Sequence, residues 1–556
     1  MTSPPLTPLA PAYAAPLAGN LLDEQLLHYR SIHAGERIAA TLPELFVAMA
    51  QDTVRDFPAL RPHQRHPWHA FLVQLAAIAL HQAGRNEPFA TAGEWRSALL
   101  TLTPDDPDGA AWCLVSPVNR PAFMQAPVLA GLDAKWELSS AVDELDVLKT
   151  SKNHDLKTRR MICASDEDWA FVLVSIQTQS PSDSGSYKES SRMDGGWGRR
   201  PGIGVVPPGY WGARWHRDLK ILLIERNRTV ETYGFDRAGL ALLWLQPWDG
   251  LAHSAFQVFQ LDPFYIEVTR RIRLLKSPEG IVAKTTTTPN ARISSINGGL
   301  TGDIWSPIDS DKDGKKVLTL RTNGFDYKTA ADLVFPASYE FSHAMQIQRG
   351  DQLEGLKMLM QSIAWGPKNT NHGYHERHVA IGKKMATLLA AKKTSEVAQI
   401  GEISKSRVQV VGEINWMLIK SLIVLFSKEA QTDISKKDPD GIKRNARDFA
   451  APFEAQCDAT FFPELIEEIE AEADTREAIR SRWLLTLADR AEQVLRTAFV
   501  AGPRSSHLRY RAQATALARL RGAMYGSPKY PAKLPALAAA LKQRQALPTE
   551  ETHEPD

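Results

Sequence analysis

The chain has little cysteine. Cys113, Cys163 and Cys457 are its three cysteines among 556 residues, and no two of them form a C-x-x-C pair. This spacing excludes a disulfide framework and a cysteine zinc site. It favours a reducing compartment, and we expect the protein to be cytoplasmic.

The chain also has little net charge and no long apolar run. Its 66 Lys and Arg nearly balance 64 Asp and Glu, for a formal charge of +2. A nucleic-acid surface would therefore be a local patch. The most apolar run, Trp416 to Phe426, is short and contains Lys420, so we expect no membrane span. Residues 1–20 lack a basic start before an apolar core, which predicts a disordered tail in place of a signal peptide; residues 546–556 predict a second.

The residue composition and the hydrophobic period of the chain change near Tyr374. Residues 21–374 mix Pro- and Gly-rich loops with β-like runs, for example 169–178 and 219–225, and with a helix from His69 to a glycine stop at Gly84. Residues 375–545 show long segments of helical period instead. These segments are His375 to Lys393, Ser406 to Lys428, Arg476 to Val500 and Arg504 to Tyr525. The pattern predicts an α+β protein: a large irregular α/β N-terminal domain followed by a C-terminal helical bundle.

The segment SGSYKESSRMDGGWGRRPGIG, Ser184 to Gly204, gathers glycines and basic residues. A phosphate loop needs Lys and a hydroxyl residue after its last glycine, and both are missing. A dinucleotide fingerprint must open a helix, which Pro201 forbids. Two alternatives stay open: a nucleic-acid contact and an idle loop. The basic residues of the segment are Lys188, Arg192, Arg199 and Arg200.

Three further motifs suggest chemistry. The stretch 309–320 imitates a calcium loop, but Leu320 stands where a bidentate Glu is needed, so we expect a hairpin turn. Two H-x-x-H-x-x-H sets could share a helix face and bind zinc, yet Pro67 and Gly373 interrupt them, and Glu376 is the nearest general base. We therefore expect no metal, no cofactor and no catalytic residue. The sets are His63, His66, His69 and His372, His375, His378.

The stretch WGPKNTNHGYHERH, Trp365 to His378, lies at the expected domain boundary. Asn369, Thr370 and Asn371 stand between a proline and an expected helix start, where a loop can present amides to base edges. A linker with a capping turn is the alternative.

Seven segments follow one another along the chain: FPALRPHQRHPWHAFLVQLAAIALHQAG, RPAFMQ, SKNHD, DWAFVLVSIQTQ, SYKESSRMDGGWGRRPG, LDPFYIEV and KNTNHGYHERH. In this order they resemble the CasA-type large subunit of the type I-E CRISPR Cascade surveillance complex. The resemblance runs from about Leu21 to about Lys542. It implies an α/β domain with a C-terminal four-helix bundle. It also implies a non-enzymatic role in antiviral defence: recognition of the protospacer-adjacent motif in double-stranded DNA, strand separation, R-loop formation and docking of a helicase-nuclease.

The resemblance also implies partners and sites. The partners are a guide RNA, target DNA, the helicase-nuclease, and the backbone, handle-binding and small subunits. The loop facing the DNA tag falls on Ser184, Gly185 and Ser186, with Lys188 close by. The wedge that splits the first base pair falls on Asn369, Thr370, Asn371 and His372. The contact with the RNA handle and the neighbouring subunit falls on Lys152, Asn153 and His154.

The chain departs from the family pattern in two respects. The family's minor-groove lysine has no clear counterpart, and His253 lies nearest. The chain also lacks the four-cysteine zinc site of some members. Arg192, Arg199 and Arg200 have two open roles, gripping phosphates or bracing the loop. Two other functions stay open: a metal-dependent hydrolase or nuclease using the His sets, and an RNA-binding scaffold without DNA contact.

Overall fold

The computed structural model describes most of the chain and divides it into two compact units. The described residues are 17–33, 35–147, 161, 163–180, 186–188, 190–193, 200–251, 255–293, 302–310, 316–336, 338–366, 370–427, 441–527 and 531–546, with backbone alone for 365–366, 370–372, 394 and 546. The first unit comprises Met1–Phe325 and Pro336–Val379, and the second Asp326–Phe335 and Ala380–Asp556. The second unit thus includes a short stretch that precedes the last strands of the first.

The core of the first unit surrounds one central helix, α2 (Arg65–Gln82). Nearly all of its side chains are buried, so it shows no polar face. Gly84 follows it with a φ of 66°, the left-handed conformation that ends helices, as the sequence predicts. The other helices of this unit are α1 (Leu42–Ala50), α3 (Ala92–Thr101), α5 (Asp166–Gln179) and α6 (Trp211–Tyr233). Both α5 and α6 pack against α2, and Trp215 of α6 donates to the Leu72 carbonyl at 3.3 Å.

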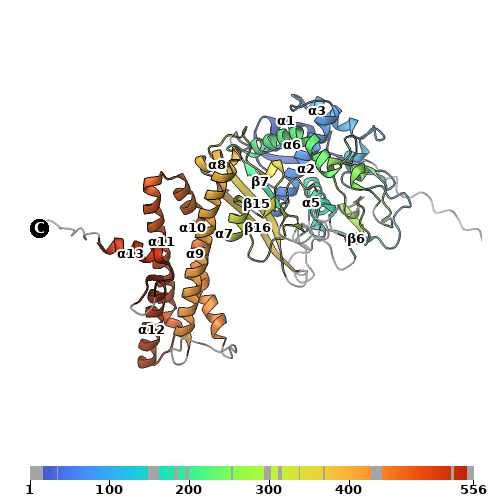
Figure 1. Cartoon of the computed structure of the whole chain (residues 1–556). Helices are drawn as coiled ribbons and strands as arrows, with labels where there is room; N and C mark the ends of the chain where they lie inside the picture. The colour runs from blue at the N-terminus through green and yellow to red at the C-terminus, as the bar shows by residue number, and fades with distance from the viewer. Residues whose placement is uncertain are drawn as a thin grey trace, which may run out of the picture. The chain divides into compact units, whose positions relative to one another are not determined.

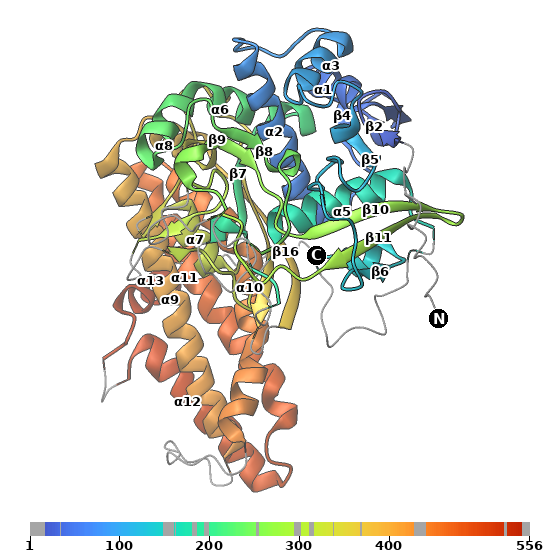
Figure 2. The ribbon, with the colours of Figure 1, turned by 90° about the vertical axis from the view of Figure 1, so that its right-hand side faces the viewer.

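Small sheets are arranged around these helices. In the described residues, β1 (Ala18–Asn20) pairs with β5 (Cys113–Val115), and β2 (Leu27–Ser31) lies between β3 (Arg37–Ala40) and β4 (Val54–Asp56). β8 (Leu240–Leu242) pairs with β9 (Leu261–Ile266). β11 (Gly280–Thr286) lies between β10 (Arg271–Ser277) and β6 (Glu137–Ser139). β10 and β11 form the hairpin that Figure 2 shows beside α5. β12 (Ile308–Asp309) lies between β13 (Lys316–Val317) and β14 (Tyr339–Glu340).

The sheet that matters most for the site has the order β16-β15-β7. Its strands are β7 (Gly202–Val206), β15 (Lys357–Gly366) and β16 (Thr370–Ala380). β7 and β15 are antiparallel, with Gly202 opposite Gln361. A Cβ on Gly202 would lie 2.3 Å from the His66 ring, and one on Gly204 would lie 2.6 Å from Nη2 of Arg214. Glycine at these positions lets β7 pass directly over α2 and α6.

The second unit is helical. Its helices are α7 (Tyr327–Val334), α8 (Lys383–Ala390), α9 (Thr394–Phe426), α10 (Ile442–Glu470), α11 (Ala473–Thr497), α12 (Ser506–Tyr525) and α13 (Pro535–Ala546). The long helix α9 packs against α10, α11 and α12 (Figure 1). A buried ion pair joins α9 to α10, with Nε of Arg407 2.6 Å from Glu468. The predicted fold class, α+β with a C-terminal helical bundle, is confirmed.

Helix α9 also has the length and composition of a membrane span over Ser395–Phe426. Half of its most apolar 18-residue stretch is buried, and a single helix of this kind is weak evidence for a membrane span.

Several local predictions were wrong. The β-like runs 169–178 and 219–225 lie inside α5 and α6. The segment His375 to Lys393 begins in strand β16 and becomes helical only at Lys383. Helix α9 starts at Thr394, well before the predicted Ser406, and α10 was not predicted. At the calcium-like stretch, β12 and β13 pair antiparallel, with Ile308 opposite Val317 and Asp309 opposite Lys316, as in the predicted hairpin; residues 311–315 lie outside the described residues.

Candidate nucleic-acid interface

The predicted site residues divide into three groups. Ser186, Lys188, Arg192 and Arg200 are described with their side chains. Thr370, Asn371 and His372 are the first residues of β16, with backbone alone described. The remaining predictions lie outside the described residues: Lys152, Asn153, His154, Ser184, Gly185, Arg199, His253 and Asn369.

The short stretch Ser186–Lys188 is held by a backbone ladder. Lys188 N donates to the Thr288 carbonyl at 3.0 Å, and Thr288 N donates to the Ser186 carbonyl at 2.9 Å. The Arg270 guanidinium donates to the Lys188 carbonyl at 2.6 Å and lies 4.8 Å from the ring centroid of Tyr187. Backbone pairing and cation–π stacking therefore fix the path of the chain at Lys188.

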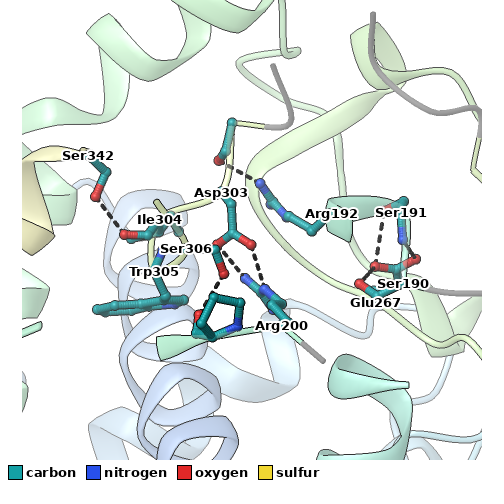
Figure 3. Close-up of polar contacts among 12 residues, drawn as sticks. Ser190, Ser191, Arg192, Arg200, Glu267, Asp303, Ile304, Trp305, Ser306 and Ser342 are labelled. Atoms are coloured by element: carbon teal, nitrogen blue, oxygen red, sulfur yellow. Dashed lines mark hydrogen bonds and ion pairs between the residues drawn. The ribbon is translucent and has the colours of Figure 1, made fainter. Parts of the chain in front are cut away.

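Two serines follow, and the buried carboxylate of Glu267 holds both (Figure 3). It accepts hydrogen bonds from Ser190 Oγ at 2.8 Å, Ser191 N at 2.9 Å and Ser191 Oγ at 3.0 Å. Tyr265 adds a contact of 2.7 Å between its hydroxyl and Ser191 Oγ. Burial raises the pKa of Glu267, and the serine hydrogen bonds reduce that rise without cancelling it.

The side chain of Arg192 points into the protein. Its guanidinium donates to the Gly302 carbonyl at 2.6 Å and to the Pro263 carbonyl at 3.2 Å. It also lies 4.1 Å from the ring centroid of Tyr265. Arg192 is buried, and these carbonyl oxygens and the aromatic face offset the cost of burying its charge.

Arg200 fixes the end of the segment through a buried ion pair. It donates two hydrogen bonds to Asp303, from Nε at 2.5 Å and from Nη2 at 2.7 Å (Figure 3). Asp303 also accepts from Trp305 N at 2.9 Å. Burial alone would raise the pKa of Asp303, but Arg200 outweighs it and lowers the pKa. Of the two roles left open by the sequence, the geometry favours bracing for both Arg192 and Arg200.

A polar cluster on β15 and β16 was not predicted from the sequence. Gln361 Nε2 donates to the Tyr374 hydroxyl at 2.8 Å and to Glu376 Oε2 at 2.9 Å, and the Tyr374 hydroxyl donates to the same oxygen at 2.5 Å. His378 Nε2 lies 3.0 Å from Glu376 Oε1, and Arg65 Nη1 lies 3.5 Å from it. Burial would raise the pKa of Glu376, but these hydrogen bonds and the Arg65 charge lower it to about 2.

The alternation of positions 374, 376 and 378 was the available signal for this cluster. Side chains two apart share a face in a strand, whereas the helix predicted here would have scattered them.

The histidines of the first set contact different partners. His63 lies 3.0 Å from Asp146, and His69 lies 2.8 Å from Asp218. Neither ring nitrogen of His66 has a hydrogen-bond partner among the described residues. Within that part of the chain, no three His, Cys, Asp or Glu side chains are grouped so as to hold a metal ion.

The architecture defines a class of protein: an irregular α+β unit followed by a helical bundle. No protein-family model matches the chain, and no curated protein matches it by sequence. Its fold, however, matches solved structures over nearly the whole length. It is the fold of Cse1 (CasA), so the resemblance stated from the sequence is confirmed at the level of fold.

Three of these structures are similar to the chain at low identity. Cse1 from Acidimicrobium ferrooxidans is 14% identical with a TM-score of 0.62, covering 94% of this chain and 98% of its own. Thermus thermophilus CasA (Cse1) is 13% identical with a TM-score of 0.58, covering 91% and 99%. A chain of a CRISPR RNA-guided surveillance complex is 12% identical with a TM-score of 0.59, covering 91% and 99%.

Proposed function

We propose that this chain is the large subunit of a type I-E Cascade complex. In this role it recognises the protospacer-adjacent motif in double-stranded DNA, promotes strand separation and R-loop formation, and docks the helicase-nuclease. It works in the cytoplasm and carries out no chemical step itself. The observation that supports this most is one sheet: the segment Ser184–Gly204, whose first residues are assigned to the DNA tag, ends in β7, and the wedge residues Thr370 and Asn371 begin β16 of that sheet.

The assigned roles are physically consistent with guide-directed recognition. Base pairing with the guide RNA supplies most of the sequence recognition, so the protein needs to read a short duplex tag. Gly185 would allow close backbone approach to a minor groove, whose degenerate pattern suits a tolerant reader. Lys188 would contact a phosphate. Thr288 and Arg270 fix the backbone at this residue and so would hold its side chain in place for that contact.

The wedge would act mechanically. Asn369, Thr370 and Asn371 are small polar residues, and Thr370 and Asn371 are the first two residues of β16. Inserted next to the tag, they would replace the contacts of the first base pair and offset the cost of unstacking, which is a few kcal/mol per step. The guide RNA would then pair with the released strand.

The other partners follow from the same proposal. Lys152, Asn153 and His154 would contact the 5′ handle of the guide RNA and the adjacent backbone subunit. The handle-binding and small subunits complete the complex, and the helicase-nuclease joins after target binding.

Replacing Asn369, Thr370 and Asn371 with alanine tests the proposal. Complexes assembled with the full chain are given a duplex that carries the guide's target behind a tag selected from a randomised pool. We expect assembly and tag binding to be retained and strand opening, followed by 2-aminopurine fluorescence beside the tag, to be strongly slowed. Unchanged opening would remove the wedge role, and RNA retention without duplex binding would assign an RNA scaffold instead.

A further inference from the structure

One sheet joins β7, the strand in which the segment Ser184–Gly204 ends, to β16, the strand that begins with the wedge residues Thr370 and Asn371. Gly202, the first residue of β7, follows Arg200 by two positions and lies directly opposite Gln361 of β15. Opposite residues of an antiparallel pair face the same side of the sheet. The missing side chain of Gly202 would point at the His66 ring of α2, so Gln361 also faces α2.

Gln361 extends this register to the wedge strand. Its side chain is buried, and its amide nitrogen reaches the Tyr374 hydroxyl at 2.8 Å and Glu376 at 2.9 Å on β16. The Gln361 side chain therefore joins β15, which pairs with β7, to β16, which begins with the wedge residues. Main-chain hydrogen bonds alone would not favour one register of β15 and β16 over another, because they are the same for every residue.

Glu376 ties the same strand to the core helix. Its carboxylate lies 3.5 Å from Arg65, the first residue of α2, and 3.0 Å from His378. β16 is an edge strand, and Glu376 taken with its backbone is exposed. Its side chain alone, however, is only 22% exposed. A partly desolvated carboxylate with several donors is held more firmly than a solvated surface pair.

The opposite face of β16 is fastened as well. Arg377 donates to the Phe325 carbonyl at 2.9 Å, and a Cβ on Gly324 would lie 2.2 Å from Nδ1 of His375. Alternate residues of the strand thus contact the unit on both faces. These contacts hold β16 against the unit at both of its faces.

We propose that Gln361 and Glu376 are positioning residues that set the spacing between the tag segment and the wedge, so that recognition of the tag places the wedge at the adjacent base pair. The inference rests on the proposed function. In this role the polar cluster links tag recognition to strand opening, in addition to stabilising the sheet.

The test uses Glu376→Gln and Gln361→Ala in assembled complexes, with Glu279→Gln on the β10–β11 turn as the matched control. Two duplexes carry the selected tag, one fully paired and one with the pairs next to the tag mismatched. We expect the two cluster variants to open the paired duplex about tenfold more slowly, as for loss of a charge-assisted hydrogen bond. Affinity for the tag should stay within about twofold, and the mismatched duplex should restore the rate.

Each outcome is decisive. Slow opening of both duplexes, or lost tag affinity, would indicate general damage to the sheet and overturn the positioning role. Wild-type opening by the cluster variants, with the alanine wedge variant still impaired, would overturn the inference and leave the proposed function standing. Normal opening by the alanine wedge variant would count against the proposed function itself.

Discussion

Arg200 and Asp303 form an ion pair that is almost fully enclosed, with side-chain exposures of 5% and 0%. The pair joins the segment Ser184–Gly204, near its end, to a residue 103 positions later in the chain. Since Glu267 and the Gly302 carbonyl hold Ser190, Ser191 and Arg192 in the same way, the described parts of the segment are braced from within the unit.

Removal of Arg200 should destabilise the first unit strongly. Arg200→Ala leaves Asp303 buried without its partner, which costs about 3–5 kcal/mol of unfolding free energy. Arg30→Ala is the matched control, because the Arg30–Asp56 pair is 48% and 35% exposed and its loss costs less than about 1 kcal/mol. Urea unfolding of both variants measures the difference, and equal losses would contradict the buried-pair assignment.

His66 should make stability depend on pH. Burial, followed by the charges of Arg200 and Arg214, holds its pKa well below the ordinary value of 6.5. Below pH 6.5 the unfolded chain gains a proton that the folded chain does not, so stability falls as the pH is lowered, by up to about 1.4 kcal/mol per pH unit. His66→Leu removes this contribution and, among the described residues, breaks no hydrogen bond. Unfolding curves between pH 7 and pH 5 should show the wild type losing more stability than the variant; parallel profiles would refute the assignment.

Gly202 should not tolerate a side chain. Its φ is not positive, so the cost of Gly202→Ala comes from the Cβ meeting the His66 ring, and we expect a loss of about 1–3 kcal/mol. Gly412→Ala in α9 is the control, because nothing lies within 4 Å of its added Cβ and alanine favours a helix by up to about 1 kcal/mol. Thermal unfolding should move in opposite directions for the two variants, and a neutral Gly202→Ala would show that the ring can shift freely.

Lys188 should contribute one phosphate contact. Lys188→Ala is expected to weaken duplex binding irrespective of the tag sequence and to reduce the slope of log affinity against log salt by about one contact. Lys276→Ala, an exposed lysine on β10, is the comparison and should keep the wild-type slope. Titrations at several salt concentrations give the slope, and an unchanged value for Lys188→Ala would remove this residue from the DNA path.

The sequence predicted the fold class and several helix ends, but it failed where burial hides the period. Residues 169–175 of α5 are all buried, so no polar face marks the helix, and its valines favour a strand assignment. The reverse error occurred at His375, where a strand with polar residues on both faces was taken for a helix start.

The site was less predictable than the fold because its contacts are distant in sequence. Glu267 and Asp303 hold the tag segment from 76 and 103 residues away. A carboxylate that will be buried against a distant arginine has no local pattern that separates it from a solvated one. The sequence therefore left the roles of Arg192 and Arg200 open, and the DNA contacts assigned to the segment stay a prediction.

The register between β7 and β15 limits how related chains can vary in length. A one-residue insertion in either strand would turn Gln361 to the opposite face and carry Gly202 away from the His66 ring. Loops elsewhere can grow or shrink at little cost. Even at an identity of 12–14% to the solved structures, we expect insertions and deletions in homologous chains to avoid these two strands.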